Sequence, residues 1–541
     1  MRACVRAALE AGEFGGEVPA EVAIERPKNP EHGDYATNVA LRLAKAAGKP
    51  ARDVAEAIAG QLRDADGIAK VDVAGPGFLN ITLATGSLGA VARQIVDAGA
   101  AYGRSGELAG TRINLEFVSA NPTGPVHLGH SRWAALGDSL HRLLEAAGAV
   151  VTAEHYINDF GSQMGKFGAS LYTVAKGRPV AEDGYHGDYV ADVAKQVVDA
   201  VPGVLELPED DALAVFTTVG EQLMLDLLRE SLARFGVQFD VWFSERAMHE
   251  SGAVDAALAT LREQGHVYGA DGAVWLRTTD FGDDKDRVLV RSTGEKTYFA
   301  ADAAYYLDKR SRGFDRLVYM LGADHHGYVG RLKAIVACAG DDPEQTIEAL
   351  IGQLVKLVRD GVEVRLSKRA GTIVTLDDLI DLVGVDAARY SLARWSADTP
   401  LTLDIAEITR RSNDNPVFYV QYAHTRAFQA KTQAASVGIG LDVFAPELLC
   451  SPFEAALLTA LSEFPRVIAT AAELRAPHRV ARYLEDLAGT YHRWYDACRI
   501  IPKGDDEITD VNRTRAWVND ATRIVLANGL GLLGVSAPER M

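Results

Sequence analysis

The stretch from Ser119 to His130, SANPTGPVHLGH, constrains the fold of this chain more than any other. Before it, residues 113–118 alternate apolar and polar side chains like a β-strand, and after it leucines recur at helical spacing as far as Gly148. Residues 150–153 then read as a second strand. The sequence therefore predicts a strand, a rigid turn, a helix and another strand, which together form a βαβ unit.

His127 and His130 lie at the start of that predicted helix. A helix start offers free N–H groups and a partial positive charge, which bind phosphate, and the two imidazoles add donors able to touch its oxygens. A lone histidine here would be an ordinary helix-start residue. Because prolines, glycines and two histidines occur together, we interpret the junction as a phosphate site that stabilises charge developing during a reaction.

Length and composition indicate several domains, since 541 residues are too many for one compact core. The net charge of −18 excludes little, because phosphate binding depends on the local field and the acidic excess lies mainly in the central region. No apolar run is long enough to span a bilayer, and the start lacks a signal-peptide core, so we expect a cytoplasmic protein without membrane contact. The cysteines, Cys4, Cys338, Cys450 and Cys498, show no CxxC or metal spacing, which argues against disulfides and zinc.

Hydrophobic patterning divides the chain into three parts. Residues 1–105 predict a small α/β domain. Residues 106–378 alternate strands and helices as in a mostly parallel sheet wound on both sides, interrupted by an insertion at about 161–296. The strand-like patterns stop at about 376, so residues 379–541 predict an all-α domain.

Three further clusters carry polar chemistry. Tyr298 and Asp302 lie on one face of a predicted helix and suit a guanidinium, although a surface aspartate beside a core tyrosine is the commoner arrangement. Residues 322–327, GADHHG, follow an apolar strand at the edge where such sheets bind ligands; the adjacent histidines point apart, so we expect no metal. The basic loop 363–372 either closes over pyrophosphate or is simply solvated.

The order of these features resembles the class I aminoacyl-tRNA synthetases and, within them, the arginyl-tRNA synthetase family. HLGH at 127–130 resembles the HIGH motif, and RLSKR at 365–369 resembles the KMSKS loop. The likeness runs almost end to end. It also covers the segments 32–38, 75–78, 119–125, 298–302, 322–328, 386–390, 415–424 and 537–541.

This resemblance implies a Rossmann-like catalytic domain with an insertion, an additional α/β N-terminal domain that contacts the tRNA D-arm, and a helical anticodon-binding domain. It implies a ligase that activates L-arginine with ATP and Mg²⁺ to arginyl-adenylate, then transfers the arginyl group to the 3′ end of tRNA(Arg). Members generally need their tRNA before they activate arginine. We expect the same here, in a monomer without zinc.

The resemblance also assigns residues. The catalytic group comprises His127, His130, Arg365, Ser367 and Lys368. The ATP site adds Gly124, Pro125, Gly129, Gly322 and Asp324 to His127, His130 and Lys368. The arginine pocket comprises Glu116, Asn121, Tyr298, Asp302 and His325, with Glu116 and Asp302 on the guanidinium and Asn121 on the α-amino end; the division of roles between Asp324 and His325 stays open. The tRNA contacts comprise Tyr35, Asn38, Phe78, Tyr419, Tyr422 and Met541.

The basic loop departs from the family motif, with Arg365-Leu366 in place of Lys-Met and Arg369 in place of the last Ser. Since Arg365 keeps the positive charge and Lys368 is present, we expect activity. One alternative is another class I synthetase or a small nucleotidyltransferase, although the latter lacks a long helical C-terminus. A second is a synthetase-derived RNA-binding regulator without ligase activity, against which both intact motifs argue. No GxxxxGK[ST] phosphate loop is present.

Overall fold

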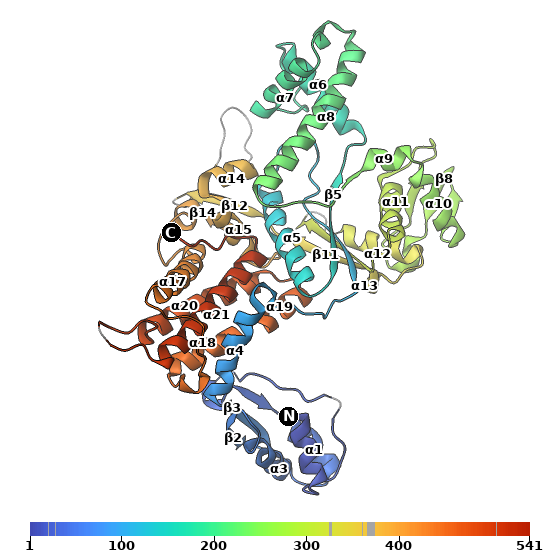
Figure 1. Cartoon of the computed structure of the whole chain (residues 1–541). Helices are drawn as coiled ribbons and strands as arrows, with labels where there is room; N and C mark the ends of the chain where they lie inside the picture. The colour runs from blue at the N-terminus through green and yellow to red at the C-terminus, as the bar shows by residue number, and fades with distance from the viewer. Residues whose placement is uncertain (20, 28, 324–326, 360, 365–373, 505) are drawn as a thin grey trace.

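A computed structural model describes the whole chain except residues 20, 28, 324–326, 360, 365–373 and 505. Figure 1 shows a central sheet with the N-terminal module at one end of the molecule and a helical insertion at the other. The C-terminal helices lie beside the sheet, on the side from which the N-terminal module extends.

The central sheet has five strands in the order β11-β10-β4-β5-β6, and every neighbouring pair is parallel. This confirms the predicted doubly wound sheet. β4 lies in the middle, and the first crossover runs from β4 to β5 while the later strands β10 and β11 add on its other side. Such a reversal of strand order opens a crevice at the carboxyl ends, where these folds bind ligands. The strands span Arg112–Glu116 (β4), Val150–Ile157 (β5), Val241–Ser244 (β6), Arg316–Gly322 (β10) and Ile347–Gly352 (β11).

The helix α5 (Leu128–Ala146) follows β4 and lies between the sheet and the C-terminal helices. It is buried on nearly all sides, so it also carries buried polar side chains that need partners. Arg132 donates to the carbonyls of Gln353, Ser396 and Thr399. Gly137 allows Phe117 to pack directly on the helix, since a Cβ there would meet the ring at 2.3 Å.

The range 161–296, predicted as one insertion, is divided by β6, a strand of the main sheet. A four-residue strand after a long helix gives too short a pattern to recognise. The first part is helical and has its own core; it comprises α6 (Ser162–Ala175), α7 (Asp188–Ala200) and α8 (Glu209–Arg234). The second comprises α9 (Glu245–Glu250), α10 (Ala253–Glu263) and the antiparallel sheet β7 (Val267–Ala270), β8 (Ala273–Leu276) and β9 (Arg287–Val290). Its core is shared with α11 (Tyr298–Ser311) and α12 (Tyr328–Cys338).

Strands do not stop at residue 376, contrary to our expectation. Leu401–Asp404 forms β14, which pairs in parallel with β12 (Val355–Arg359), and β13 (Val362–Glu363) pairs with β12 on its other side. The apolar–polar alternation of β14 is only four residues long, and a partner more than forty residues earlier fixes it. The helices between are α14 (Leu376–Val383) and α15 (Val385–Ala393), and two short helices flank these sheets, α13 (Pro343–Thr346) and α16 (Ile405–Ile408).

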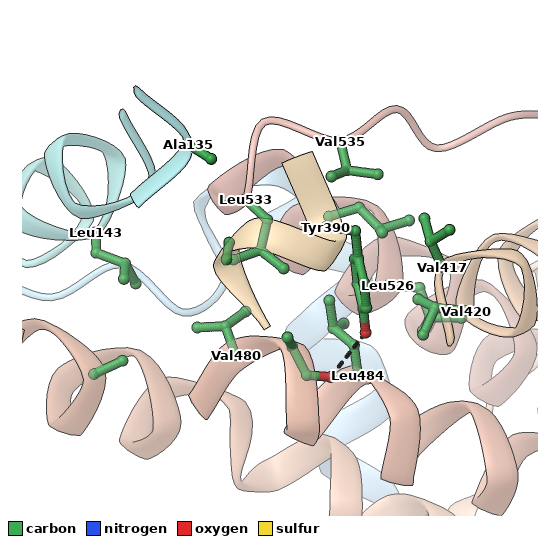
Figure 2. Close-up of a cluster of buried hydrophobic side chains, with 14 of the residues drawn as sticks. Ala135, Leu143, Tyr390, Val417, Val420, Val480, Leu484, Leu526, Leu533 and Val535 are labelled. Atoms are coloured by element: carbon green, nitrogen blue, oxygen red, sulfur yellow. Dashed lines mark hydrogen bonds between the residues drawn. The ribbon is translucent and has the colours of Figure 1, made fainter. Parts of the chain in front are cut away.

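The C-terminal helices share one continuous core with the catalytic sheet. Figure 2 shows Tyr390 of α15 surrounded by apolar side chains of the C-terminal helices, with its hydroxyl donating to the carbonyl of Ala481 at 3.0 Å. The helices are α17 (Pro416–Ser436), α18 (Pro452–Ser462), α19 (Phe464–Glu473), α20 (His478–Ala497) and α21 (Asp510–Leu532). Residues 452–473 are apolar enough by length and composition to cross a membrane, but they form two helices, α18 and α19, that contribute to this core.

Arg389 joins three parts of the molecule through a fully buried guanidinium. It pairs with Asp138 of α5 and donates to the carbonyl of Phe235 after α8 at 2.8 Å. It also donates to the carbonyl of Leu533 after α21 at 3.1 Å, beside Gly534, where any Cβ would collide with it. The catalytic helix and the C-terminal helices are therefore fixed to each other by satisfied polar groups as well as by apolar packing.

The N-terminal module is an antiparallel sheet, in the order β1-β3-β2, with its own core. Its elements are α1 (Arg2–Glu10), β1 (Tyr35–Thr37), α2 (Val39–Ala47), α3 (Ala51–Arg63), β2 (Ile68–Ala74) and β3 (Phe78–Leu83). The next helix, α4 (Thr85–Ala98), falls within the range 1–105 that we assigned to this domain, yet it packs against α18 and α21. The sheet-containing module therefore ends at Leu83.

Candidate active site

The chain turns sharply out of the central sheet immediately after β4. Val118 and Ser119 adopt φ values of 68° and 42°, in a region that side-chain-bearing residues rarely occupy. The turn is held by the Ser119 hydroxyl, which donates to Glu116 at 3.1 Å and accepts the backbone N–H of Tyr156 at 3.2 Å. Backbone strain of this kind is retained where the surrounding structure fixes it, commonly at a functional site.

His127 lies at the helix start that the sequence predicts, as the N-cap of α5, and its ring stacks on His130 at 3.8 Å between centroids. Its Nδ1 accepts the N–H of Gly129 at 3.2 Å. Burial lowers the pKa of His127, so the ring is neutral at pH 7. Because Nδ1 is the acceptor, the ring proton lies on Nε2, which has no acceptor among the described residues and can donate to an anion.

His130 is also neutral. Burial, followed by the neighbouring imidazoles of His127 and His155, lowers its pKa to about 3. Its buried Nδ1 has no hydrogen-bond partner in the part of the chain that the structure describes. The helix start therefore presents two uncharged imidazoles together with the N-terminal end of α5, an arrangement that favours anions.

The segment that follows the basic loop is tied to this helix start. Leu128 N–H donates to the carbonyl of Val374 at 2.9 Å, and Leu376 N–H donates to the carbonyl of Val126 at 2.7 Å. The end of the segment carrying the predicted KMSKS motif is thus anchored at His127. The predicted residues Arg365, Ser367 and Lys368 themselves, and likewise Asp324 and His325, lie outside the described residues.

Glu116 is the last residue of β4 and forms an ion pair with a buried lysine. Lys309, which is fully buried, donates to Glu116 Oε2 at 2.6 Å. The Tyr305 hydroxyl lies between two carboxylates, 2.6 Å from Glu154 Oε1 and 3.0 Å from Glu116 Oε2, and shares its proton between them. The neighbouring Glu154 accepts two hydrogen bonds from Arg312, at 2.6 and 3.0 Å. We call Glu154, Lys309, Arg312 and Tyr305 the floor of the predicted arginine pocket.

Asp302 lies on α11, and the charge of Arg331 lowers its pKa by less than burial raises it. Burial raises its pKa to about 7; the hydrogen bond from Tyr328 lowers it, while Glu245 and Glu116 raise it. Tyr298, one turn earlier on the same helix, has 68% of its surface exposed. The structure therefore confirms the helix that the sequence predicts here and aligns the ring and the carboxylate along it.

Glu245 is a site residue that the sequence analysis missed. It begins α9 directly after β6, is 2% exposed and bonds the hydroxyl of Tyr156. Burial and the charge of Asp159 raise its pKa to about 6. A carboxylate at the end of a parallel strand is a recognisable signal, but it required knowing that 241–244 is a strand. We call Asp302, Glu245 and Tyr298 the mouth of the predicted arginine pocket.

Asn121 and Gly322 lie near these groups with different surroundings. Asn121 is exposed, and its side-chain amide donates to Gln163 of α6 at 3.2 Å. Gly322 is the last residue of β10, at the carboxyl edge of the sheet. Among the described residues, no cluster of three or more His, Cys, Asp or Glu side chains has the geometry to hold a metal ion.

The residues predicted to contact tRNA lie in two separate places. In the N-terminal module, Phe78 is 41% exposed and Asn38 is the N-cap of α2. Tyr35 is half-buried, and the Arg26 guanidinium lies over its ring at 4.6 Å, so one face of this ring is already covered. Its hydroxyl also accepts a hydrogen bond from Arg26 at 3.0 Å.

At the C-terminal end, Tyr419 and Tyr422 lie one turn apart on α17, with His492 between them at 5.0 and 5.5 Å. The chain terminus returns to the same helix, because the Thr425 hydroxyl donates to the carbonyl of Pro538 at 2.8 Å. Met541, which is 53% exposed, follows three residues later. These three side chains therefore belong to one region of the helical domain.

Comparison with known proteins follows the same division of the chain. The model "Arginyl tRNA synthetase N terminal domain" matches residues 1–83, "tRNA synthetases class I (R), catalytic domain" matches 105–399, and "DALR anticodon binding domain" matches 420–541. The chain is 58% identical to the arginine–tRNA ligase of Kineococcus radiotolerans and 59% identical to that of Frankia alni, in each case over 100% of this chain and 98% of the relative.

Solved structures show the same fold. The arginyl-tRNA synthetase of Thermus thermophilus aligns with a TM-score of 0.73 at 22% identity, over 100% of this chain and 99% of that one. The arginyl-tRNA synthetase of Plasmodium falciparum aligns with a TM-score of 0.71 at 14% identity, over 100% and 98%. At these identities the likeness concerns the fold alone.

Proposed function

This chain belongs to the arginyl-tRNA synthetase family, in class I of the aminoacyl-tRNA synthetases, and from that membership we propose how its residues divide the reaction. The enzyme is an arginine–tRNA ligase. Class I synthetases use ATP, so the reactants are arginine, ATP and tRNA. Each reactant meets a different part of the chain.

The arginine guanidinium binds at the mouth of the pocket. The observation that carries this assignment is that Asp302 has a pKa of about 7, because burial, Glu245 and Glu116 outweigh the hydrogen bond from Tyr328 and the charge of Arg331. Glu116 Oε2 is occupied by Lys309 and Tyr305, but Oε1 bonds the Ser119 hydroxyl and can still accept a guanidinium N–H. The guanidinium fork suits paired carboxylate oxygens and stacks on an aromatic ring, which Tyr298 supplies.

ATP binds at the start of α5. His127 donates from Nε2 and His130 lies against it, while the N–H groups of the helix start face the phosphates, with Gly124, Pro125 and Gly129 allowing close approach. Lys368 and Arg365 add positive charge, and Ser367 adds a hydroxyl donor, from the segment that is anchored at Val374. Gly322 with Asp324 faces the ribose. His325 and Asn121 complete the amino-acid side.

In the first step an arginine carboxylate oxygen attacks the α-phosphorus of ATP. A new P–O bond forms and the bond to the β-phosphate oxygen breaks, giving arginyl-adenylate and pyrophosphate. In the second step a terminal ribose hydroxyl of tRNA(Arg) attacks the arginyl carbonyl and releases AMP and a proton. Positioning and charge stabilisation supply most of the catalysis, since phosphoryl-type transfer needs little covalent help from protein. Mg²⁺ enters with ATP.

The tRNA contacts two regions. Tyr35, Asn38 and Phe78 of the N-terminal module meet the D-arm, and Tyr419, Tyr422 and Met541 meet the anticodon, where aromatic rings stack on unpaired bases. Arginine activation requires bound tRNA. The enzyme acts as a monomer in the cytoplasm, without membrane contact and without zinc.

The test is tRNA-dependent pyrophosphate exchange measured with each of the amino acids in turn. Label should enter ATP with arginine and tRNA(Arg) together. Exchange with lysine or glutamine in place of arginine, or with no amino acid, would overturn the assignment of the pocket. Exchange with arginine in the absence of tRNA would overturn the tRNA requirement alone.

A further inference from the structure

The helical insertion, α6 to α8, forms its own core. It also contacts the turn between β4 and α5, residues 117–127, which we call the signature turn. Figure 1 shows the insertion projecting away from the central sheet. Two of its side chains, Gln163 of α6 and Tyr189 of α7, bond successive parts of the turn between β4 and α5. The turn carries both the proposed arginine contact Asn121 and the proposed ATP-binding helix start. Hydrogen bonds from the insertion to this turn can therefore position the groups that bind both substrates.

The stronger bond comes from Tyr189, whose hydroxyl donates to the backbone carbonyl of Thr123 at 3.0 Å. Thr123 is 7% exposed, and Tyr189 is half-buried. Burial raises the pKa of Tyr189 to about 12, so the hydroxyl keeps its proton. The ring also lies against the next residue, because a Cβ on Gly124 would meet the Tyr189 oxygen at 3.5 Å.

This bond sets the direction of the Gly124 N–H. In a trans peptide the carbonyl of one residue and the N–H of the next point in opposite directions. With the Thr123 carbonyl turned toward the insertion, the N–H of Gly124 points away from it. That N–H has no acceptor among the described residues, so it is available to an anion three residues before His127.

Gln163 acts on the other substrate. Its Oε1 accepts the side-chain N–H of Asn121 at 3.2 Å. An Asn carboxamide held by its nitrogen presents its oxygen on the opposite side, and an α-ammonium group needs such an acceptor. The entry to α6 lies at the mouth of the pocket as well, since a Cβ on Gly161 would meet the Tyr298 hydroxyl at 3.4 Å.

We propose that Tyr189 and Gln163 are positioning residues through which the helical insertion sets the two ends of the signature turn. Tyr189 orients Gly124 for the ATP phosphates, and Gln163 orients Asn121 for the α-amino group of arginine. Neither side chain touches the reacting atoms. This inference rests on the proposed function, because it assumes that ATP and arginine occupy the two ends of the turn.

The test is a pair of variants with opposite expected selectivity, measured by tRNA-dependent pyrophosphate exchange. Tyr189→Phe removes one hydroxyl and should raise the KM for ATP by about 3- to 10-fold, as expected for one lost hydrogen bond, and leave the KM for arginine unchanged. Gln163→Ala should raise the KM for arginine by about 3- to 10-fold and leave the KM for ATP unchanged. Gln163→Glu keeps the acceptor and should restore the arginine KM.

The matched control is Tyr172→Phe, which removes a hydroxyl from the insertion core beside Phe216. It should change neither KM. Wild-type KM values in both Tyr189→Phe and Gln163→Ala would overturn the inference, as would parallel rises in both KM values that track a lower Tm. If the wild-type enzyme itself shows no arginine-dependent exchange, the proposed function fails instead, so the two failures are distinguishable.

Discussion

Two carboxylates of the same pocket, Glu154 on the floor and Asp302 at the mouth, have opposite electrostatic situations. Burial acts on both in the same direction. For Glu154, burial raises the pKa, but Arg312, Lys309 and Tyr305 together bring it below its ordinary value. For Asp302, burial raises the pKa to about 7, and its hydrogen bond from Tyr328 does not offset that shift.

The difference separates charges that are paired within the protein from charges that remain for a ligand. The floor is paired within the protein, so its carboxylate has no need of a ligand and its removal costs stability. At the mouth, the charge of Arg331 does not offset the effects of burial and the neighbouring carboxylates on Asp302, so a substrate that brings a further cation is favoured there. Variants that change the floor and the mouth separately therefore test this division.

Lys309→Met should lower the free energy of unfolding by about 3–5 kcal/mol, because it leaves Glu116 buried beside Glu154 without its cation. Urea denaturation measures it. The matched control is Lys333→Met, which removes an exposed pair with Glu344 and should cost about 1 kcal/mol or less. Equal losses in the two variants would show that the floor is not a structural ion pair.

Asp302→Asn should raise the KM for arginine by about 30- to 1000-fold, or about 2–4 kcal/mol, because it removes the charge opposite the guanidinium. The KM for ATP should stay close to that of the wild type. Asp308→Asn is the control, since Asp308 lies on the same helix but pairs with Arg312 at 2.9 Å. Proportional increases in both KM values for Asp302→Asn would remove this residue from the guanidinium site.

Arginine binding should weaken as the pH falls below about 7, by up to about tenfold per pH unit, because the guanidinium needs the ionised form of Asp302. The KM for arginine measured between pH 6 and 8 tests this dependence, and Asp302→Asn should flatten the profile.

The stability of the protein without arginine should depend on pH in the opposite sense. The Asp302 carboxyl binds a proton between 3.8 and about 7 when the unfolded chain does not, so the free energy of unfolding falls as the pH rises through that window.

Glu245→Gln should raise the KM for arginine by about 3- to 10-fold, because Glu245 acts on the guanidinium through its charge and bonds Tyr156. The rise should exceed that of Glu295→Gln, whose carboxylate is exposed and pairs with Arg291. Single-turnover adenylate formation at saturating arginine should be unaffected. Identical kinetics in the two variants would confine the mouth to Asp302 and Tyr298.

The sequence predicted the features whose signal is local. His127 lies at the start of α5, Tyr298 and Asp302 share α11, and the parallel sheet follows from alternating apolar strands and helices. It did not predict which carboxylates are paired, because Lys309 meets Glu116 across 193 residues. It also missed β6 and β14, four-residue strands that exist only because a neighbouring strand fixes them.

The shared core around Tyr390 and Arg389 bears on how the family can be re-engineered. A chimaera that exchanges only the C-terminal helices of two relatives would place unmatched surfaces against α5 and α15, since both lie inside the same apolar core. The transplant would need to include the inward faces of α5 and α15 and the Arg389–Asp138 pair. For this architecture the exchangeable unit is an interface with two sides, and the sequence boundary near residue 400 is not a place to cut.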